Sequence, residues 1–512
     1  MVSAFHFPEY DQLDGIALAE MVRLKEVTPL ELVSAAVQRI DAGNGAINAV
    51  VHLLEREAKA QCEVPLADGP LSGVPLLVKD LLAEIQGCPT RNGSRLFAHF
   101  VAREDSQTIK RYRQAGLIFV GKTATPELGL HPYTESDATG ATRNPWNLEL
   151  SPGGSSGGAC AAVAAGMTPI AHGSDGGGSI RLPASHCGVF GLKPTRGRSP
   201  CGPHFSELWQ GLVVEHAVSK SVRDSAAMLD ILIAGSDDAD AYRWPAPAQS
   251  FLAGIGDAPG RLRIAYTFKP FLGGDLSPDC RAALESSLKL LTDLGHEVVE
   301  AHPPLASPDQ LCEAMLTLVC GEMASLVQNA GRMLDRVATY ADFESGTWAL
   351  ARQGHILKAV DLARARELAL HQGRIMSAFH EHYDVLVTPV ANQLASKVGA
   401  FRLSPLEDRL SRRVLGKWGM DWPLRLGNRL AEHSRTVMEY MGWSTPFNMS
   451  GQPAMSVPLY WNETGLPIGT QFIAKMGNEA LLLQLARSLE VARPWRHRSP
   501  PHSSAASSTQ IK

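Results

Sequence analysis

The chain of 512 residues lacks an excess of charge of either sign, because 48 Lys and Arg residues nearly balance 52 Asp and Glu residues. The net charge of −4 gives no reason to expect nucleic acid or an anionic membrane as a partner. The first fifteen residues lack a basic segment followed by an apolar core, so no secretory signal is predicted. No apolar run in the sequence approaches the length of a membrane span, and we expect no membrane contact.

Cysteine pairs, metal motifs and repeats are missing as well. The eight cysteines are dispersed and form no C-x-x-C pair, which favours reduced thiols in a cytoplasmic protein. The histidines of residues 380–383 lack the spacing of a zinc-binding H-E-x-x-H motif, so we expect neither a metal nor another cofactor. No internal repeat and no long proline-rich or like-charge linker divides the chain, which favours one large domain.

What the sequence does contain is a stretch rich in glycine and serine at residues 153–197. It holds two serines in glycine settings, Ser155 and Ser179, on either side of an apolar segment. Glycine frees the backbone to form loops, and we expect the two loops to lie near each other, each presenting a serine hydroxyl. The predicted elements are a loop at 153–158, a helix of small residues at 159–165, a strand at 168–172 and a loop at 175–179.

The second loop suits attack on an amide. A serine that attacks an amide carbonyl forms an oxyanion, which backbone N–H groups must stabilise. Successive glycines let such amides converge and leave room for a substrate. We therefore predict Ser179 as the nucleophile and an oxyanion hole formed by the amides of Gly176, Gly177, Gly178 and Ser179. A structural turn or a phosphate-binding nest built from the same amides is the alternative that this loop alone leaves open.

A serine hydroxyl needs a base, and Lys79 is the candidate. It ends the apolar run GVPLLVKD, and burial there would lower the pKa of its amine. A neutral amine could take a proton from Ser155, and Ser155 in turn could take one from Ser179. The alternatives are a lysine that reaches outward from a strand end or one that pairs with Asp80.

Together these residues resemble the amidase signature family. Lys79 in GVPLLVKD, Ser155 in GGSSGG and Ser179 in DGGGSIRLPASHCGVFGLKPT match its motifs residue by residue. The resemblance implies a triad in which Lys79 acts on Ser179 through Ser155, a bridging serine that follows a cis peptide bond. It implies supporting roles for three further residues, Ser156, Asp175 and Arg181. A bulkier residue often stands at the position of Gly176, but the backbone donor survives that difference.

The fold that the resemblance implies is α/β, one large domain with a mixed central β-sheet surrounded by helices. We assign residues 1–500 to this domain, with a core at 70–235 and 440–495 and a variable substrate-pocket region at about 237–440; 501–512 is predicted to be a disordered tail. Alternating helices and strands in the first part of the chain suggest a mostly parallel sheet. Helices are expected at 14–25, 28–40 (ended by Gly43 and Gly45), 106–115, 221–232, 277–294, 311–336, 346–383 and 478–491, and strands at 49–53, 72–78, 117–120, 261–266, 297–300, 385–387 and 465–473.

Two other motifs point to different chemistry. Residues 116–123 fit the phosphate-binding pattern G-x-x-x-x-G-K-[ST], which would make the chain a nucleotide-binding module. The four residues between the glycines are Leu, Ile, Phe and Val, which make a strand, so we reject that interpretation. The glycines around Ser155 also fit a G-x-S-x-G nucleophile elbow in outline. His172 and His186 flank Ser179, and we interpret both as packing residues.

The predicted function is hydrolysis of small amides. Within the family, ATRNPWN at 141–147 and TPFNMSGQPAMSVP at 445–458 look most like aminohexanoate cyclic-dimer hydrolases and related bacterial amidases. Anilides, carbamates and amino-acid amides stay open as substrates, and the alternative is the glutaminase subunit of a tRNA-dependent amidotransferase. The residues at 405–440 form either a lid or a self-association surface of a homodimer. Three residues are candidates for substrate contact, Trp209, Cys320 and Asn448.

Overall fold

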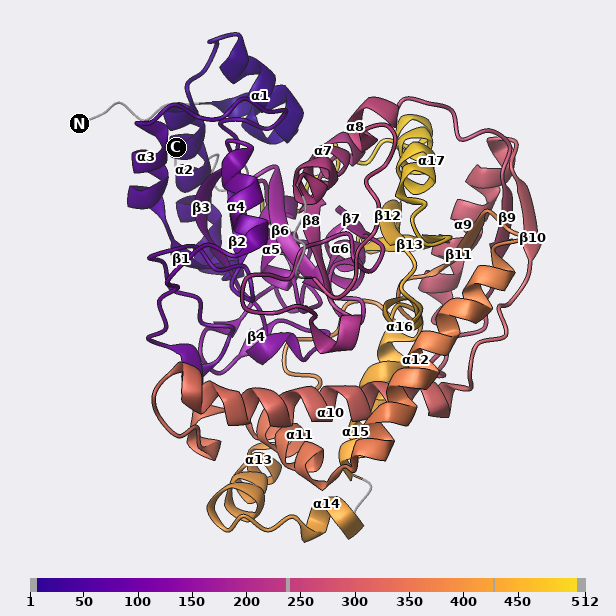
Figure 1. Cartoon of the computed structure of the whole chain (residues 1–512). Coiled ribbons are helices and arrows are strands. Elements are labelled where there is room, and N and C mark those ends of the chain that lie inside the picture. Colours follow the sequence, from indigo (N-terminus) through magenta and orange to yellow (C-terminus); the bar gives the residue numbers. More distant parts are fainter. Residues whose placement is uncertain (1–6, 236–239, 427–428, 504–512) are drawn as a thin grey trace.

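One long sheet runs through the part of the chain that the structure, a computed structural model, describes: residues 7–235, 240–426 and 429–503 (Figure 1). Its strand order is β1-β3-β2-β6-β8-β7-β12-β13-β11-β9-β10. Two short strands form a separate hairpin. The bounds are β1 (Val50–Leu53), β2 (Pro75–Lys79), β3 (Ile118–Thr123), β4 (Glu135–Ser136), β5 (Gly140–Ala141), β6 (Ile170–Asp175), β7 (Phe190–Lys193), β8 (Val214–Ser219), β9 (Arg263–Tyr266), β10 (Glu297–Glu300), β11 (Val385–Pro389), β12 (Ala454–Trp461) and β13 (Pro467–Ala474).

The sheet is mixed, as the resemblance implied, and the mostly parallel order expected from the first part of the chain holds for β3, β2 and β6 but not for the sheet as a whole. Strands β3, β2 and β6 run parallel, as do β11, β9 and β10. The edge strand β1 and the central pairs are antiparallel. The difference comes from the second half of the chain, where β12 returns directly as β13 without the crossover helix that a parallel pair requires.

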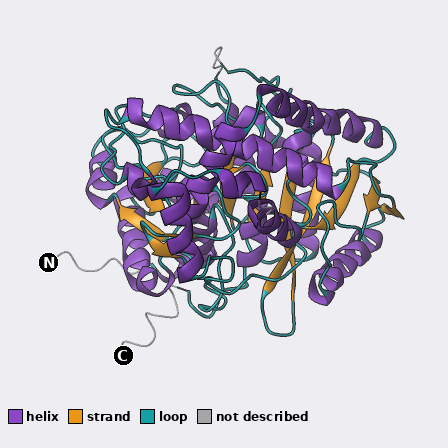
Figure 2. Ribbon diagram, turned by 90° about the horizontal axis from the view of Figure 1, so that it is seen from below, coloured by secondary structure: helices purple, strands orange, loops and turns teal. Residues whose placement is uncertain are grey.

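Helices pack on both sides of the strands (Figure 2). Most follow the predicted segments closely, and α2 begins with a capping box between Thr28 and Glu31. The bounds are α1 (Gly15–Arg23), α2 (Pro29–Ile47), α3 (Glu55–Cys62), α4 (Gln107–Gln114), α5 (Gly157–Ala164), α6 (Arg181–Cys187), α7 (Val222–Ile233), α8 (Phe251–Gly254), α9 (Pro278–Asp293), α10 (Pro308–Met333), α11 (Ser345–Ile356), α12 (Ala359–Phe379), α13 (Pro405–Ser411), α14 (Trp422–Leu426), α15 (Arg429–Met441), α16 (Pro446–Ser450) and α17 (Glu479–Ala492).

Two helix boundaries differ from the prediction. Helix α2 continues past Gly43 to Ile47, because a glycine inside a helix costs only about 1 kcal/mol and Ile47 is fully buried. Residues 346–383 are not one long helix: the chain is extended at Leu357, and α12 starts anew where the Lys358 amide donates to Asp361.

The long helix α10 also departs from the sequence analysis. Among the described residues it is the one helix whose length and composition would suffice to cross a membrane, over Pro308–Gly331. Its apolar side chains Leu311, Leu318 and Met323 are buried against the rest of the fold. The statement that no apolar run approaches that length was therefore wrong, although a core helix has the same composition.

Helix α5 shows how closely the elements around the glycine-serine stretch pack. All its residues are buried, and they are glycine, alanine, cysteine and valine. A Cβ atom added at Gly158 would lie 2.4 Å from the Ala124 amide nitrogen, and one at Gly157 would lie 2.2 Å from Thr134 Oγ1. Only small residues let α5 approach the neighbouring backbone, which brings the loop before it against the ends of β2 and β6.

A different surface is formed by residues 403–422, on and after α13 at the lower edge of Figure 1. This segment, called here the 403–422 segment, carries a cluster of exposed large apolar side chains: Leu403, Leu406, Leu410, Trp418, Met420 and Trp422.

Of the predicted tail at 501–512, only 501–503 is described. There the His502 amide donates to the Pro145 carbonyl. Residues 504–512 lie outside the described part.

Candidate active site

Lys79 and the serines come together because β2 and β6 are parallel neighbours in the sheet. Lys79 is the last residue of β2, and β6 ends at Asp175, just before the loop that holds Ser179. The carboxyl ends of parallel strands meet at the same edge of a sheet, where α/β proteins place their sites. The Ser155 loop joins them there, because the Ser156 amide donates to the Ser179 carbonyl at 3.1 Å.

The amine of Lys79 is buried among hydroxyl groups. Its Nζ donates to Ser155 Oγ at 2.7 Å, and to Ser156 Oγ and Ser174 Oγ at 3.0 Å each. Burial lowers the pKa of Lys79 to about 7, although the nearby carboxylate of Asp175 opposes that shift. A large share of this lysine is therefore neutral at neutral pH and can accept a proton.

Ser155 lies between the lysine and the second loop. The peptide bond between Gly154 and Ser155 is cis, as the resemblance implied. Gly154 fits only as glycine, because an added Cβ would lie 2.7 Å from the carbonyl oxygens of His131 and Tyr133. The Ser155 side chain is thus fixed beside Lys79 by backbone packing on its amino-terminal side.

Ser179 is only partly buried, unlike the other serines of this cluster. Within the described residues its hydroxyl has no hydrogen-bonding partner, so it is available to a substrate and to Ser155. This is the property that a nucleophile requires.

The glycine loop differs in one respect from the predicted oxyanion hole. The Gly178 amide donates to Asp175 Oδ1 at 2.7 Å, so it is already engaged, and its inclusion was wrong. The amides of Gly176, Gly177 and Ser179 have no acceptor among the described residues. Three backbone donors, not four, are therefore available beside the Ser179 hydroxyl.

Asp175 and Arg181 hold this loop in place. Arg181 donates to both carboxylate oxygens of Asp175 at 2.9 Å, and both side chains are fully buried. Burial alone would raise the pKa of Asp175, but the Arg181 guanidinium and the hydrogen bonds to the carboxylate hold it well below its ordinary value. The Asp175 carboxylate also accepts from the amide of Ile180, which fixes the turn that follows the nucleophile.

Asn448 belongs to this support, and its prediction as a substrate contact was wrong. Its side chain is only 1% exposed. Its amide nitrogen donates to Asp175 Oδ1 and to the Leu212 carbonyl, and its oxygen accepts from Arg181. With every polar atom of the Asn448 side chain engaged, it braces the Asp175–Arg181 pair and does not face a substrate.

The two other predicted substrate contacts, Cys320 and Trp209, have different surroundings. Cys320 is fully buried on α10, and its backbone carbonyl would lie 2.0 Å from a Cβ at Gly354, so its backbone belongs to the α10–α11 contact. A substrate contact of the Cys320 thiol stays a prediction. Trp209, in contrast, lies against the glycine loop. A Cβ at Gly176 would lie 3.4 Å from Trp209 Cε3 and 2.8 Å from Val213 Cγ2. Those two side chains fill the space that a bulkier residue at 176 would use.

Sequence reasoning missed several residues around the loop. Met315 and Met441 lie within 3.4 Å of the positions where Cβ atoms at Gly177 and Gly178 would stand. Ser444 and Thr445 donate to the Gly177 carbonyl at 3.0 and 2.9 Å. These bonds place the run at 443–458 against the site, but no local pattern marked the two methionines.

The residues of the phosphate-binding pattern and the two histidines near Ser179 lie in the packed interior. Gly121, Lys122 and Thr123 belong to strand β3, and Lys122 Nζ donates to the Ala83 carbonyl at 2.6 Å. His172 contacts Glu215 at 3.2 Å in the interior, and burial lowers the pKa of His186 to about 4. In the described residues no group of three or more His, Cys, Asp or Glu side chains is placed to hold a metal ion.

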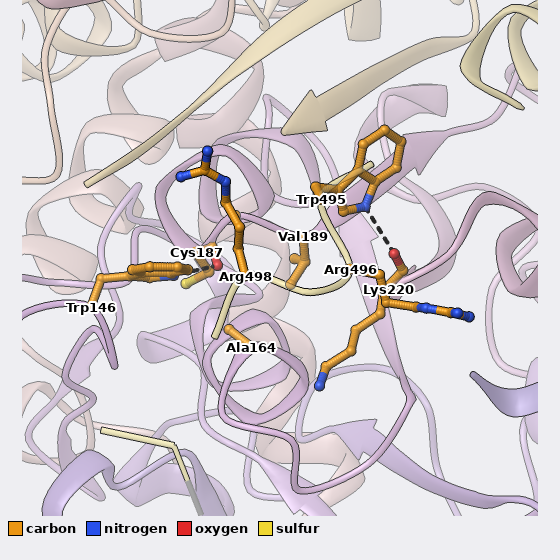
Figure 3. A pocket seen from close by; sticks show the side chains of 9 residues that line it. Trp146, Ala164, Cys187, Val189, Lys220, Trp495, Arg496 and Arg498 are labelled. Atoms are coloured by element: carbon orange, nitrogen blue, oxygen red, sulfur yellow. Dashed lines mark hydrogen bonds between the residues drawn. The ribbon is translucent and has the colours of Figure 1, made fainter. Parts of the chain in front are cut away.

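A small hollow elsewhere in the molecule is lined by Trp146, Lys220, Trp495 and Arg498, among others (Figure 3). The Trp495 indole donates to the Lys220 carbonyl at 2.9 Å. In Figure 3 the charged ends of Lys220 and Arg498 point in opposite directions, so they do not converge on one ligand. None of the serines around Lys79 lines this hollow.

Comparison with known proteins agrees with this geometry. The sequence profile of the Amidase family matches residues 31–483. The chain belongs to the amidase family. It is an enzyme that hydrolyses amide bonds, and its single large α/β fold is that of amidase signature structures.

Several relatives cover nearly the whole enzyme. The 6-aminohexanoate-cyclic-dimer hydrolase of Paenarthrobacter ureafaciens is 36% identical over 496 residues, which is 95% of this chain and 96% of the relative. The acylamidase of Rhodococcus erythropolis is 33% identical over 504 residues, 96% and 98% of the two chains. A solved structure of 6-aminohexanoate cyclic dimer hydrolase superposes with a TM-score of 0.85 at 35% identity, covering 96% of this chain and 99% of that one.

A component of the glutamyl-tRNA(Gln) amidotransferase of Thermotoga maritima is less similar, with a TM-score of 0.71 and 26% identity over 95% of this chain and 96% of that one. The amidase interpretation therefore fits better than the glutaminase alternative.

Proposed function

We propose that the enzyme cleaves small linear and cyclic amides through an acyl-enzyme on Ser179, with Lys79 as the base and Ser155 as the bridge. The observation that carries this proposal is the buried Lys79 amine, which is bonded to Ser155 and has no carboxylate partner among the described residues. A lysine in this setting is a base, whereas one paired with a carboxylate would stay charged.

The reaction begins when neutral Lys79 takes the Ser155 proton while Ser155 takes the Ser179 proton. Ser179 Oγ then attacks the amide carbonyl. The developing oxyanion accepts hydrogen bonds from the amides of Gly176, Gly177 and Ser179. The amine leaves with a proton returned from Lys79 through Ser155, and water hydrolyses the acyl-enzyme by the same route.

Apolar side chains around the loop favour an uncharged acyl group. Trp209, Met315 and Met441 lie beside the positions where Cβ atoms at Gly176, Gly177 and Gly178 would stand, and none of the atoms nearest to those positions belongs to a charged side chain. Two relatives carry the names cyclic-dimer hydrolase and acylamidase. We therefore propose aliphatic amides, including cyclic oligoamides of aminohexanoate, as the substrate class.

Release of amine or ammonia by the purified chain tests this. The panel comprises hexanamide, an aliphatic anilide, a cyclic amide, a carbamate and glutamine, with Ser179→Ala as the blank. We expect turnover of several amides other than glutamine, all lost in Ser179→Ala. Full activity in that variant would contradict the assignment of Ser179 as the nucleophile. Activity of the wild-type chain on glutamine alone would favour the alternative of an amidotransferase subunit.

We also propose that the enzyme is bacterial and cytoplasmic. No disulfide joins any of the eight cysteines within the described chain, and the relatives named above are bacterial.

We propose further that the enzyme self-associates through the 403–422 segment. Of the two uses considered for 405–440, the exposed side chains of Leu406 and Trp418 favour an interface over a lid. Light scattering after gel filtration should give a dimer that Leu406→Glu with Trp418→Glu converts to a monomer. A monomeric wild-type chain would contradict this.

A further inference from the structure

The three hydroxyls around Lys79 match the three donors of a charged ammonium group. Ser155, Ser156 and Ser174 each lie within 3.0 Å of Nζ, and Lys79 is fully buried. An ammonium has three N–H donors and no acceptor. The charged lysine is therefore fully hydrogen-bonded without a carboxylate, although nothing in the sequence identified Ser174 as part of the site.

The Ser156 hydroxyl has no freedom in this arrangement. It donates its proton to the Ser174 carbonyl at 3.1 Å and accepts from the Ser174 amide at 3.3 Å. Its remaining role toward Lys79 is that of an acceptor. One N–H of the lysine is thus directed at Ser156 in both the charged and the neutral state.

The Ser174 hydroxyl is different, because Lys79 Nζ is its one partner among the described residues, at 3.0 Å. Ser174 is itself buried, with 3% of its surface exposed. When Lys79 becomes neutral it keeps two N–H groups and gains one lone pair. With Ser156 taking one N–H and Ser174 the other, the lone pair is directed at Ser155.

We propose that Ser174 is a positioning residue of the catalytic lysine: its hydroxyl takes one N–H of Lys79, which stabilises the charged amine and aims the lone pair of the neutral amine at Ser155. This inference rests on the proposed function, in which Lys79 is the base. It assigns the Ser174 hydroxyl to Lys79 alone in both protonation states, whereas the Ser156 hydroxyl also joins its loop to the backbone of β6.

The test is the pH dependence of kcat/KM for hexanamide hydrolysis by wild type, Ser174→Ala and Ser174→Thr. Loss of a hydrogen bond to the charged form favours the neutral form, so in Ser174→Ala the acidic limb should move to lower pH by about 0.5 to 1 unit. The plateau should fall by about tenfold, because the lone pair is less well aimed. Ser174→Thr keeps the hydroxyl and should restore both the limb and the plateau.

Ser287→Ala is the matched control, since Ser287 is also fully buried but bonds to Thr470 at 2.7 Å, away from Lys79. An unmoved limb in Ser174→Ala, or an equal movement in Ser287→Ala, would overturn the inference. If Ser174→Ala does not fold, Ser174→Cys serves in its place, because a thiol accepts hydrogen bonds weakly and should move the limb in the same direction. A wild-type profile without an acidic limb would contradict the proposed function itself, and with it the role of Ser174.

Discussion

Lys79 and Lys122 lie on neighbouring parallel strands, and both are fully buried, yet their surroundings differ. Lys79 is bonded to three serine hydroxyls. Lys122 donates to the Ala83 carbonyl and lies in the field of the Asp80 and Glu84 carboxylates. Burial lowers the pKa of both lysines, but only Lys79 is next to a hydroxyl that can pass a proton to a substrate-facing serine.

The comparison shows that burial alone does not make a lysine a base. The partner decides, because a carboxylate stabilises the charged form whereas a hydroxyl can also give up a proton to the neutral form. Asp80 follows Lys79 in sequence, yet its carboxylate accepts from the Arg91 amide and acts on Lys122. The sequence alone allowed an ion pair between Lys79 and the adjacent Asp80. Successive residues of an extended chain point to opposite faces, so the two side chains lie apart.

The largest expected effect is that of Lys79→Met. Without the base, kcat/KM should fall by about 10³-fold or more, while the chain stays folded because methionine keeps most of the buried volume of the lysine side chain. Amine release and thermal unfolding measured on the same preparation check this. Activity within tenfold of wild type would show that Lys79 is only a structural residue.

Lys122→Met should give the opposite pattern. It leaves the Ala83 carbonyl without its donor and removes the cation that acts most strongly on Asp80, so the free energy of unfolding should fall by about 1 to 3 kcal/mol. Denaturant unfolding measures that loss, and kcat/KM per folded molecule should stay close to wild type. A large loss of turnover in folded Lys122→Met would contradict the division between the two lysines.

The pH profile of the wild-type enzyme sharpens the comparison. The pKa of Lys79 is about 7, so the base is neutral above that pH and protonated below it. Activity should therefore rise through about pH 7, and it should fall by about tenfold for each unit further below. Rates in a constant-ionic-strength buffer series give the limb; a profile flat from about pH 5 to about pH 9 would speak against a lysine base.

Asp80→Asn should have the smallest effect. Because its carboxylate acts on Lys122, the acidic limb should move by less than about 0.3 unit, and stability should fall by about 1 kcal/mol. Kinetic and unfolding measurements on this variant belong beside those on Lys122→Met. A limb that moves clearly to lower pH would mean that Asp80 serves Lys79 after all.

The sequence predicted the serine and lysine positions because they stand in local motifs. It predicted most helices and strands for the same reason, since caps and periodicity are local signals. The prediction for Asn448 was wrong because its partners, Asp175 and Arg181, are distant in the chain and meet it only through tertiary packing. Ser174 escaped notice because a serine in a buried strand resembles any other until its partner is known.

The most direct test of the central claim is the rate of acyl-enzyme formation with an activated hexanoyl anilide, followed by mass spectrometry and peptide mapping across pH. The account predicts a hexanoyl group on Ser179, formed with an apparent pKa close to that of Lys79 and absent in Ser179→Ala. A hexanoyl group on another residue, or acylation of Ser179 at a rate that does not change with pH, would contradict it.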